Sequence, residues 1–258
     1  MGSALVDAWS RKTSFSISVV DPITYKFLKK KYGKKITFHK SINTVKMINK
    51  FNLIVFAVKP QIASQVISEY NTLTNKKILF LSIIAGKKMS FFEKNLGHPI
   101  QMIRAMPNMP ALIEKGITCL ISNKLTSNKN KIIANKLFKC VGKVLWLKKE
   151  SDLDMVTAIS GSGPAYYFLF IEHLIVEATK LGLKSHISKE LIYQTASGSI
   201  ELLLKNNNNA RQLRKNIAVK GGTTEAAINV FQKKFVLKKI ISKAINAAYQ
   251  RSKILGRD

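Results

Sequence analysis

The sequence predicts an α/β domain with a parallel sheet, followed by an all-α domain. Across residues 1–150, short runs rich in β-branched and aromatic residues alternate with helical stretches, as is typical of a parallel sheet with crossover helices. From Ser151 onward no strand pattern is persuasive, and apolar residues recur on single helical faces. A chain of 258 residues is long enough for two domains, which we place at residues 1–150 and 151–258.

The first domain contains the predicted strands. They lie at residues 14–20, 53–58, 77–85, 100–106, 118–122 and 143–147. The stretches predicted as helices lie at residues 1–12, 23–32, 62–70, 90–96 and 128–140. Two of these helices are followed by Gly33 and Gly97, and glycine is the residue that most often ends a helix.

The second domain is predicted to begin with a helix at Ser151, because Ser151 and Asp154 resemble a capping box. Pro164 can start another segment that continues to residue 181, since proline at the first helical position loses no donor that the helix needs. Residues 187–204 and 236–249 each place their apolar side chains on one helical face. Such faces need a partner surface, which a second subunit commonly provides.

The formal net charge of +29 at pH 7 raises the question of nucleic-acid binding, but the composition argues against it. The chain has 37 lysines and only 6 arginines, whereas proteins that read nucleic acids rely on the planar fork of arginine. The lysines are scattered over the whole chain. We therefore expect no specific nucleic-acid partner, and a positive field that attracts anionic ligands.

Membrane insertion, secretion and metal binding have no support in the sequence. No apolar run approaches the roughly 20 residues that span a bilayer, and the N-terminus shows no basic region followed by an apolar one. Cys119 and Cys140 are expected to be reduced, packed thiols in a cytoplasmic protein. The four histidines show no metal-ligand spacing, so we expect no metal site.

Residues 221–225 (GGTTE) form the strongest local motif and stand directly before a helical run at residues 226–233. Two glycines let the backbone approach a ligand closely, and free amides at a helix start form an anion site suited to a carboxylate or phosphate. A flexible turn followed by a threonine N-cap explains the same pattern equally well.

Three further motifs are ambiguous when taken singly. Residues 160–166 (SGSGPAY) permit either ligand approach or a close helix–helix crossing, and alone they favour the crossing. Residues 59–61 (KPQ) and 106–108 (MPN) each follow a predicted strand, at the edge where open α/β sheets bind ligands. Either could be an ordinary turn, but two on one edge favour a cofactor crevice.

Taken in order, these motifs resemble those of pyrroline-5-carboxylate reductase. Residues 56–61 (FAVKPQ) are similar to the family's cofactor-side strand and loop, and residues 104–111 (RAMPNMPA) to its R-x-MPN-x-PA turn. Residues 154–166 (DMVTAISGSGPAY) resemble the hallmark of its helical domain, and residues 221–224 follow in the family's order. The resemblance covers essentially the whole chain. It implies a Rossmann-like NAD(P)-binding domain followed by an all-helical substrate-binding and dimerisation domain.

The resemblance also implies a reaction. NADPH or NADH would reduce the C=N bond of L-1-pyrroline-5-carboxylate and give L-proline, in the last step of proline biosynthesis. A protonated cyclic imine is already electrophilic, so the protein has mainly to hold the C=N bond against the nicotinamide. A homodimer or higher homo-oligomer would form through the C-terminal helices, with the substrate pocket near the subunit interface.

Individual residues receive roles from the same resemblance. The substrate carboxylate would be held by Gly221, Gly222, Thr223 and Thr224, with Thr224 nearest the ring nitrogen. Thr157 and Ser160 would lie near the junction of substrate and nicotinamide, and together with Thr224 they form the predicted catalytic set. The residues predicted to bind the cofactor are Gly2, Val58, Lys59, Pro60 and Asn108.

The beginning of the chain departs from the family pattern. The family opens with a strand and a glycine-rich turn, roughly G-x-G-x-M-G-x-A, whereas this chain begins Met1-Gly2-Ser3, as though cut inside that turn. We expect the first, central strand to be missing, two neighbouring strands to lack a partner, and Gly2 to be a remnant of the phosphate site. A start codon placed too late, a deliberate truncation or a decaying gene copy would each explain this.

Two other functions remain open. A related NAD(P)-dependent imine or hydroxy-acid oxidoreductase would share the fold, but it would not need both residues 160–166 and residues 221–224. A non-catalytic remnant of the family that folds, oligomerises or binds polyanions would account for the unusual start and the high charge.

The preference between NADH and NADPH is open too. Asp21 stands at the end of a predicted strand, where an acid would hold a ribose hydroxyl and favour NADH. Lys26, Lys29 and Lys30 follow closely and could meet a 2′-phosphate.

Overall fold

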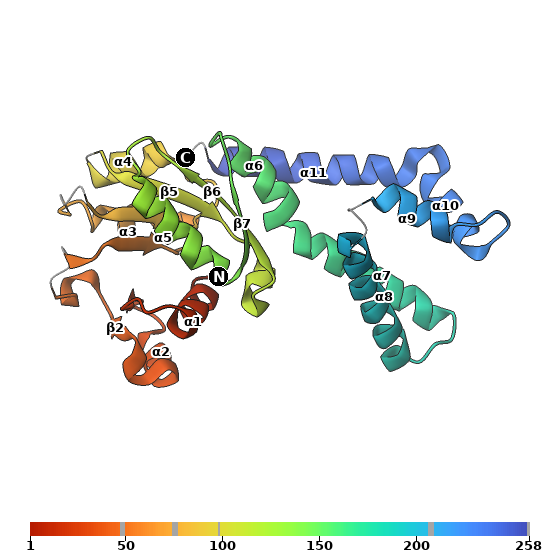
Figure 1. The fold of residues 1–258 in the computed structure, drawn as a ribbon, viewed down its shortest axis with the longest axis horizontal. Coiled ribbons are helices and arrows are strands. Elements are labelled where there is room, and N and C mark those ends of the chain that lie inside the picture. Colours follow the sequence, from red (N-terminus) through yellow and green to blue (C-terminus); the bar gives the residue numbers. More distant parts are fainter. Residues whose placement is uncertain (47–49, 74–76, 98, 206–208, 257–258) are drawn as a thin grey trace. The chain divides into compact units, whose positions relative to one another are not determined.

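A computed structural model of the chain describes residues 1–46, 50–73, 77–97, 99–205 and 209–256. The chain divides into two compact units (Figure 1). Unit 1 comprises Met1–Ser162 and Ala248–Asp258, and unit 2 comprises Gly163–Ala247. By packing, residues 151–162 therefore belong with the sheet-containing unit. The domain boundary placed at residue 150 from the sequence remains a prediction.

The described residues of unit 1 form two sheets, and in each the strands stand in chain order. The smaller sheet pairs β1 (Ser18–Val20) with β2 (Thr37–His39). The larger sheet consists of β3 (Leu53–Phe56), β4 (Leu79–Ser82), β5 (Gln101–Met106), β6 (Gly116–Ser122) and β7 (Gly142–Trp146). Within the described residues no ladder joins the two sheets, so β1 and β3 are edge strands.

The sheets are parallel except for one pair. β5 and β6 run antiparallel, whereas β1–β2, β3–β4, β4–β5 and β6–β7 are parallel. Only the turn at residues 107–115 connects β5 to β6, and it leaves no room for the crossover helix that a parallel pair requires. The predicted parallel arrangement is wrong for this pair.

Helices cover both faces of the larger sheet. The helices of unit 1 are α1 (Gly2–Lys12), α2 (Tyr25–Tyr32), α3 (Ala63–Ser68), α4 (Met89–Leu96), α5 (Asn128–Lys139) and α6 (Asp152–Val156). Short 3₁₀ turns lie at η1 (Gly33–Lys35), η2 (Ile42–Thr44), η4 (Pro60–Ile62) and η5 (Met109–Ile113). Strand β2 was not predicted. Helix α2 was predicted at residues 23–32 and begins two residues later than predicted.

The core consists of two apolar clusters, one on each face of the larger sheet. Leu79 and Leu81 of β4 pack in the cluster that includes α1 and α5, while Phe80 packs in the cluster that includes α3 and α4. Successive strand residues point to opposite faces, so a strand buried on both faces is apolar throughout. This burial explains the continuous apolar run that predicted the strand.

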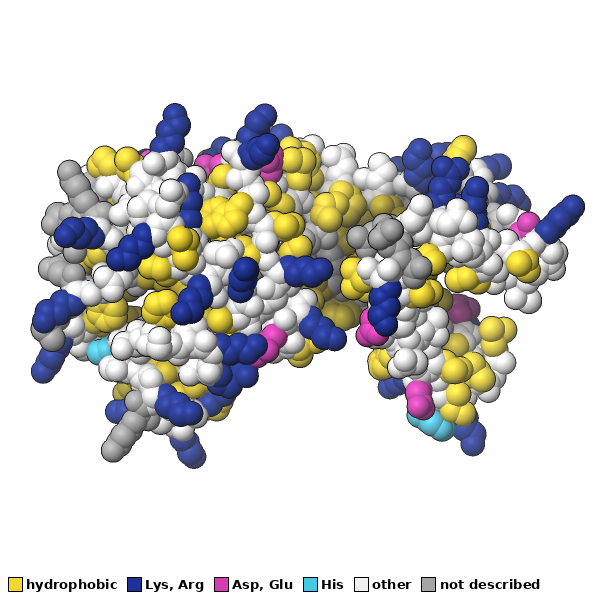
Figure 2. Space-filling view, viewed as in Figure 1, with side chains coloured by type: hydrophobic (Ala, Val, Ile, Leu, Met, Phe, Trp, Pro, Cys, Tyr) yellow, Lys and Arg dark blue, Asp and Glu magenta, His cyan; other side chains and the backbone are white. Residues whose placement is uncertain are grey.

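Unit 2 consists of helices and their connecting turns within its described residues. Its elements are α7 (Gly163–Lys180), α8 (Ser185–Lys205), α9 (Ala210–Ile217), α10 (Thr223–Gln232), η7 (Lys233–Phe235) and α11 (Val236–Leu255), the last of which continues into unit 1. Many large apolar side chains of this unit are exposed, among them Phe168 at 56%, Tyr193 at 53% and Ile240 at 58% (Figure 2). These surfaces are available to a partner subunit.

No helix formed by the described residues is both long and apolar enough to cross a bilayer. Lys and Arg side chains are spread over the face of the molecule shown in Figure 2 rather than gathered in one patch.

Candidate active site

The turn that follows β5 contacts the segment that follows α6, within unit 1. Asn108 Oδ1 accepts a hydrogen bond from the amide of Ile117 at 2.9 Å, and Asn108 Nδ2 donates to Ser160 Oγ at 3.4 Å. The packing is close: a Cβ on Gly161 would lie 2.5 Å from Met106 Cε. Two of the predicted motifs, residues 106–108 and residues 160–166, are thereby brought together.

The segment Thr157–Gly161 (η6) is a π-helical turn, in which the amide of Ser162 donates to the carbonyl of Thr157 at 2.9 Å. Such turns inside α-helices are frequent at functional sites. No sequence pattern predicted this turn. Pro164 was the available signal, since a proline leaves the carbonyl four residues earlier without its helical donor.

The hydroxyls of Thr157 and Ser160 differ in whether they can donate a hydrogen bond to a ligand. Thr157 Oγ1 donates to the carbonyl of Leu153 at 2.7 Å, so towards a ligand it can act only as an acceptor. Ser160 Oγ accepts from Asn108, so its own hydrogen can be donated to a ligand. Both side chains are half-buried.

An ion pair holds the start of α6 against the sheet. Arg104 on β5 is 6% exposed, and its Nη1 lies 2.7 Å from Glu150 Oε1. The same oxygen accepts from the amide of Met89 at the start of α4, also at 2.7 Å. The sequence signal for this contact was a charged residue inside an otherwise apolar strand. Ser151 makes no capping hydrogen bond and already has helical backbone angles, so the predicted capping box is wrong.

The end of α11 secures the other side of α6. Ser252 Oγ donates to Asp154 Oδ1 at 2.7 Å, three residues before Thr157. Nearby, Gly86 after β4 has a φ of +81°, and a Cβ there would lie 2.9 Å from the carbonyl oxygen of Leu255. The π-helical turn is therefore held from β5, from α4 and from the C-terminal helix.

The cofactor residues predicted after β3 lie at the carboxyl end of that strand. Val58 packs against the core, Lys59 is exposed and has no anionic partner among the described residues, and Pro60 begins η4. At the same strand end, a Cβ on Gly2 would lie 3.3 Å from the Cβ of Ala57. The start of α1 therefore meets the carboxyl end of β3.

This arrangement fits a dinucleotide. Within the described residues the amides of Gly2, Ser3 and Ala4 have no hydrogen-bond acceptor, as the first amides of a helix usually do not. A helix start at the carboxyl end of a parallel strand is a favourable place for a pyrophosphate. The residues present can thus hold NAD(P) through α1, the β3 end and the turn at Asn108.

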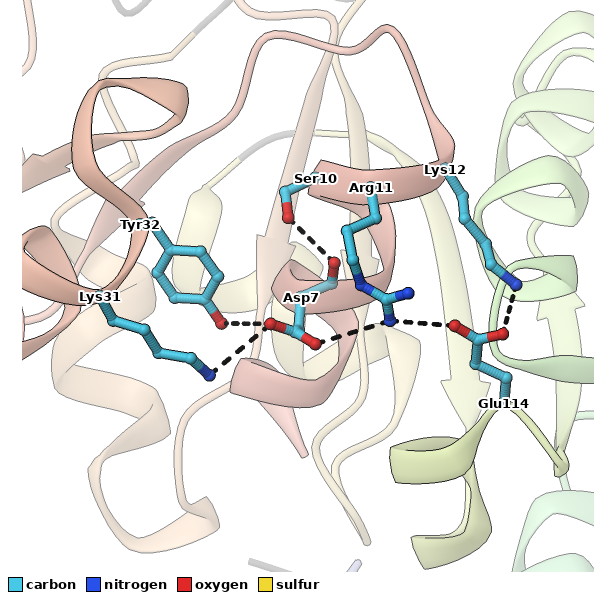
Figure 3. A network of polar contacts seen from close by, with 7 residues as sticks. All are labelled: Asp7, Ser10, Arg11, Lys12, Lys31, Tyr32 and Glu114. Carbon is cyan, nitrogen blue, oxygen red and sulfur yellow. Dashed lines mark hydrogen bonds and ion pairs between the residues drawn. The ribbon is translucent and has the colours of Figure 1, made fainter.

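A polar network joins α1 to its neighbours (Figure 3). Asp7 accepts from the hydroxyl of Tyr32 on α2 at 3.2 Å. Arg11 lies 2.9 Å from Glu114, which also pairs with Lys12, and these hydrogen bonds hold the pKa of Glu114 below its ordinary value of 4.5. Glu114 ends the turn that begins at Asn108, so the network connects α1 with that turn.

The predicted carboxylate site lies in unit 2 and is described by itself. Gly221 has a φ of +77°, which favours glycine, and its amide donates to Glu225 Oε2 at 2.7 Å. Gly222 is the N-cap of α10, so the alternative of a threonine N-cap is wrong. Within the described residues, the amides of Thr223 and Thr224 have no acceptor and are open to an anion.

The structure thus brings Asn108, Thr157 and Ser160 together, and places Gly2 beside the strand end that precedes Val58. Residues 221–224 form one helix start in the other unit. Across the described parts of the chain, no three His, Cys, Asp or Glu side chains gather as a metal site; His98 lies outside those parts.

Comparison with protein families matches residues 150–255 to a model described as "Pyrroline-5-carboxylate reductase dimerisation". The chain is 37% identical over 201 residues to the pyrroline-5-carboxylate reductase of Pseudomonas aeruginosa, a match covering 78% of this chain and 73% of that protein.

Solved structures agree with this similarity. The Plasmodium falciparum pyrroline carboxylate reductase with NADP bound superposes with a TM-score of 0.87 at 32% identity, covering 99% of this chain and 94% of that one. The pyrroline-5-carboxylate reductase of Coxiella burnetii gives a TM-score of 0.88 at 30% identity, covering 100% and 95%.

Proposed function

This chain belongs to the pyrroline-5-carboxylate reductase family, and we propose how its own residues serve that family's reaction, the NAD(P)H-dependent reduction of L-1-pyrroline-5-carboxylate to L-proline that ends proline biosynthesis. The observation that carries the proposal is the contact of Asn108 with Ser160, because it joins the turn at a strand end to the π-helical turn. Open α/β sheets bind their ligands at that edge.

The substrate carboxylate binds at the start of α10. The amides of Thr223 and Thr224 are open to an anion, and the helix dipole adds to the attraction. Gly221 and Gly222 add no side chains of their own, and the Gly221 amide already donates to the Glu225 carboxylate. Thr224 is half-buried and supplies a hydroxyl close to the ring nitrogen of the substrate.

Thr157 and Ser160 orient the reacting groups. Since Thr157 can only accept, it receives the N–H of the protonated imine, which keeps the C=N bond polarised. Ser160 can donate to the nicotinamide carboxamide or to the substrate. Gly2, Val58, Lys59, Pro60 and Asn108 hold NAD(P)H, which when bound supplies the hydride.

No carboxylic acid is required for this chemistry, because a protonated imine that gains a hydride is already the product amine. Carboxylates in these segments already have partners: Glu150 pairs with Arg104, Asp154 accepts from Ser252, and Glu225 accepts from the amide of Gly221 at the start of α10. Catalysis rests on orientation of the substrate and on a positive field.

The assembly is a homodimer or a larger homo-oligomer formed through the helices of unit 2. Their exposed apolar side chains and the match to a dimerisation model support this arrangement. A cytoplasmic location and the lack of a specific nucleic-acid partner remain predictions. The free thiols of Cys119 and Cys140 are in keeping with a reducing compartment.

The proposal is tested by pyrroline-5-carboxylate-dependent oxidation of NADH and NADPH, followed by absorbance, with proline identified as product. Thr224→Ala is expected to lower kcat/KM about tenfold or more, through loss of a hydrogen bond to a charged substrate, and to leave cofactor affinity unchanged.

Thr179→Ala is the matched control, because Thr179 is exposed in the same unit and its hydroxyl bonds within its own helix. Unchanged kinetics in Thr224→Ala would remove the carboxylate site from α10. Absence of proline formation by the unmodified chain would contradict the proposed function.

A further inference from the structure

We propose that Asp21 makes this reductase prefer NADH to NADPH. The inference rests on the proposed function, since it concerns the cofactor that the reaction uses. In dinucleotide-binding folds, an acid about 20 residues after the glycine turn, at a strand end, accepts from the ribose 2′-hydroxyl of NAD. Asp21 directly follows β1 and stands about that far from Gly2, which begins α1.

The carboxylate of Asp21 occupies the donors that a 2′-phosphate would need. Oδ1 accepts from the amides of Ile23 and Thr24, at 2.9 and 2.7 Å. Oδ2 accepts from the hydroxyl of Thr24 at 2.6 Å. A phosphate in this turn would have to displace a carboxylate that belongs to the chain, and it would lose those three hydrogen bonds.

Asp21 also discriminates by its charge. Burial raises its pKa, but the hydrogen bonds from the Thr24 hydroxyl and from the amides of Thr24 and Ile23 outweigh burial, so the pKa lies below its ordinary value of 3.8. The carboxylate is therefore ionised at neutral pH and repels a phosphate of like charge. A ribose hydroxyl is instead attracted, because Oδ2 accepts from one donor among the described residues and can accept from a second.

The nearby lysines do not reverse this preference. Lys26, Lys29 and Lys30 are exposed on α2, and within the described residues none of them forms an ion pair with Asp21. Their mobile, screened charges attract the pyrophosphate of either cofactor. Lys31 is directed to Asp7 and Tyr32. The held carboxylate is therefore the group that distinguishes a hydroxyl from a phosphate.

Equilibrium binding of NADH and of NADPH to the full-length chain, measured by calorimetry without substrate, tests the proposal. The unmodified protein is expected to bind NADH at least about tenfold more tightly than NADPH. Asp21→Asn keeps an oxygen that can accept from the amides of Ile23 and Thr24, but it removes the negative charge. The ratio of NADH affinity to NADPH affinity should therefore fall at least about tenfold. Asp21→Ser should act in the same direction, and Asp21→Glu should retain the NADH preference.

Glu69→Gln is the matched control, since it removes the same charge from an exposed site in unit 1; it should change both affinities by one common factor. Tighter binding of NADPH by the unmodified protein, or an unchanged affinity ratio in both Asp21→Asn and Asp21→Ser, would overturn the proposal. If NADPH bound more tightly and proline still formed, only this inference would fail. If neither dinucleotide bound, the proposed function would fail with it.

Discussion

Single side chains set how unit 1 responds to pH, and Tyr70 is the clearest case. Tyr70 is 9% exposed, and its ring meets Phe56 edge-on at 5.3 Å. Burial, with a smaller effect from the charge of Glu69, raises the pKa of Tyr70 from 10.0 to about 12. The neutral phenol is thus favoured in the folded state. Its contribution to stability is complete below pH 10 and is lost as the pH rises towards 12.

Tyr70→Phe is expected to lessen that alkaline loss. The variant keeps the ring and removes the ionisable hydroxyl, so the free energy of unfolding should fall less between pH 10 and pH 12, by up to about 3 kcal/mol at about 1.4 kcal/mol per pKa unit. Urea unfolding at a series of pH values measures this difference. Tyr25→Phe, at a less buried side chain of α2 in the same unit, is the control and should behave like the unmodified protein. Parallel losses for Tyr70→Phe and the unmodified protein would refute the assignment.

Contacts between single residues also show what the sequence could not predict. The motifs correctly identified the family, and their order pointed to Asn108 and Ser160. The contact between them spans 52 positions, so no local pattern could predict it. Arg104 was recognisable as a charge in an apolar strand, but its partner Glu150 lies beyond β7 and is found only through the fold.

At the scale of elements, most strands could be predicted because burial makes them apolar. β4 is buried along its whole length and formed a continuous apolar run. β2 was missed because it is three residues long and contains the exposed Thr37 and the half-buried His39. The antiparallel β5–β6 pair and the π-helical turn were missed as well, since both depend on tertiary packing rather than on periodicity.

One glycine sets the junction of β6 and β7. Gly142 has a φ of +140° and pairs with Gly116, and a Cβ on it would lie 1.9 Å from the Gly116 carbonyl oxygen. The clashing atoms belong to the backbone of a paired strand, which cannot move aside as the end of a flexible side chain can. Gly142→Ala is therefore expected to cost about 3 kcal/mol or more, combining overpacking with left-handed strain.

Gly97→Ala is the matched control for that substitution. Gly97 ends α4 with a φ of +74°, and nothing lies within 4 Å of a Cβ built there. Only conformational strain of about 1–2 kcal/mol is expected. Thermal and urea unfolding of both variants give the comparison. Equal costs for the two substitutions would show that β7 can move away from β6 without penalty.

For the molecule as a whole, the charge of +29 predicts salt-sensitive kinetics. The substrate carries a carboxylate and the cofactor carries phosphates, so a positive field raises their encounter rates. Raising the salt concentration from about 0.01 M to about 1 M shortens the screening length from about 30 Å to about 3 Å. We expect kcat/KM to fall steeply over that range while kcat changes little.

Steady-state kinetics at a series of potassium chloride concentrations measure this effect. Sucrose at matched osmolarity is the control, because it changes solution properties without screening charge. A kcat/KM independent of salt would mean that the surface lysines do not guide either ligand to the site.

The order of strands β3 to β7 has a consequence for synthesis of the protein. Because each strand lies beside the one that precedes it in the chain, every newly emerged strand finds its partner already translated. Pairing between sequence neighbours keeps the loops that must close short, and short loops close at low entropic cost. The sheet can therefore grow one strand at a time on the ribosome, and its β7 edge is completed before the helical unit begins to emerge.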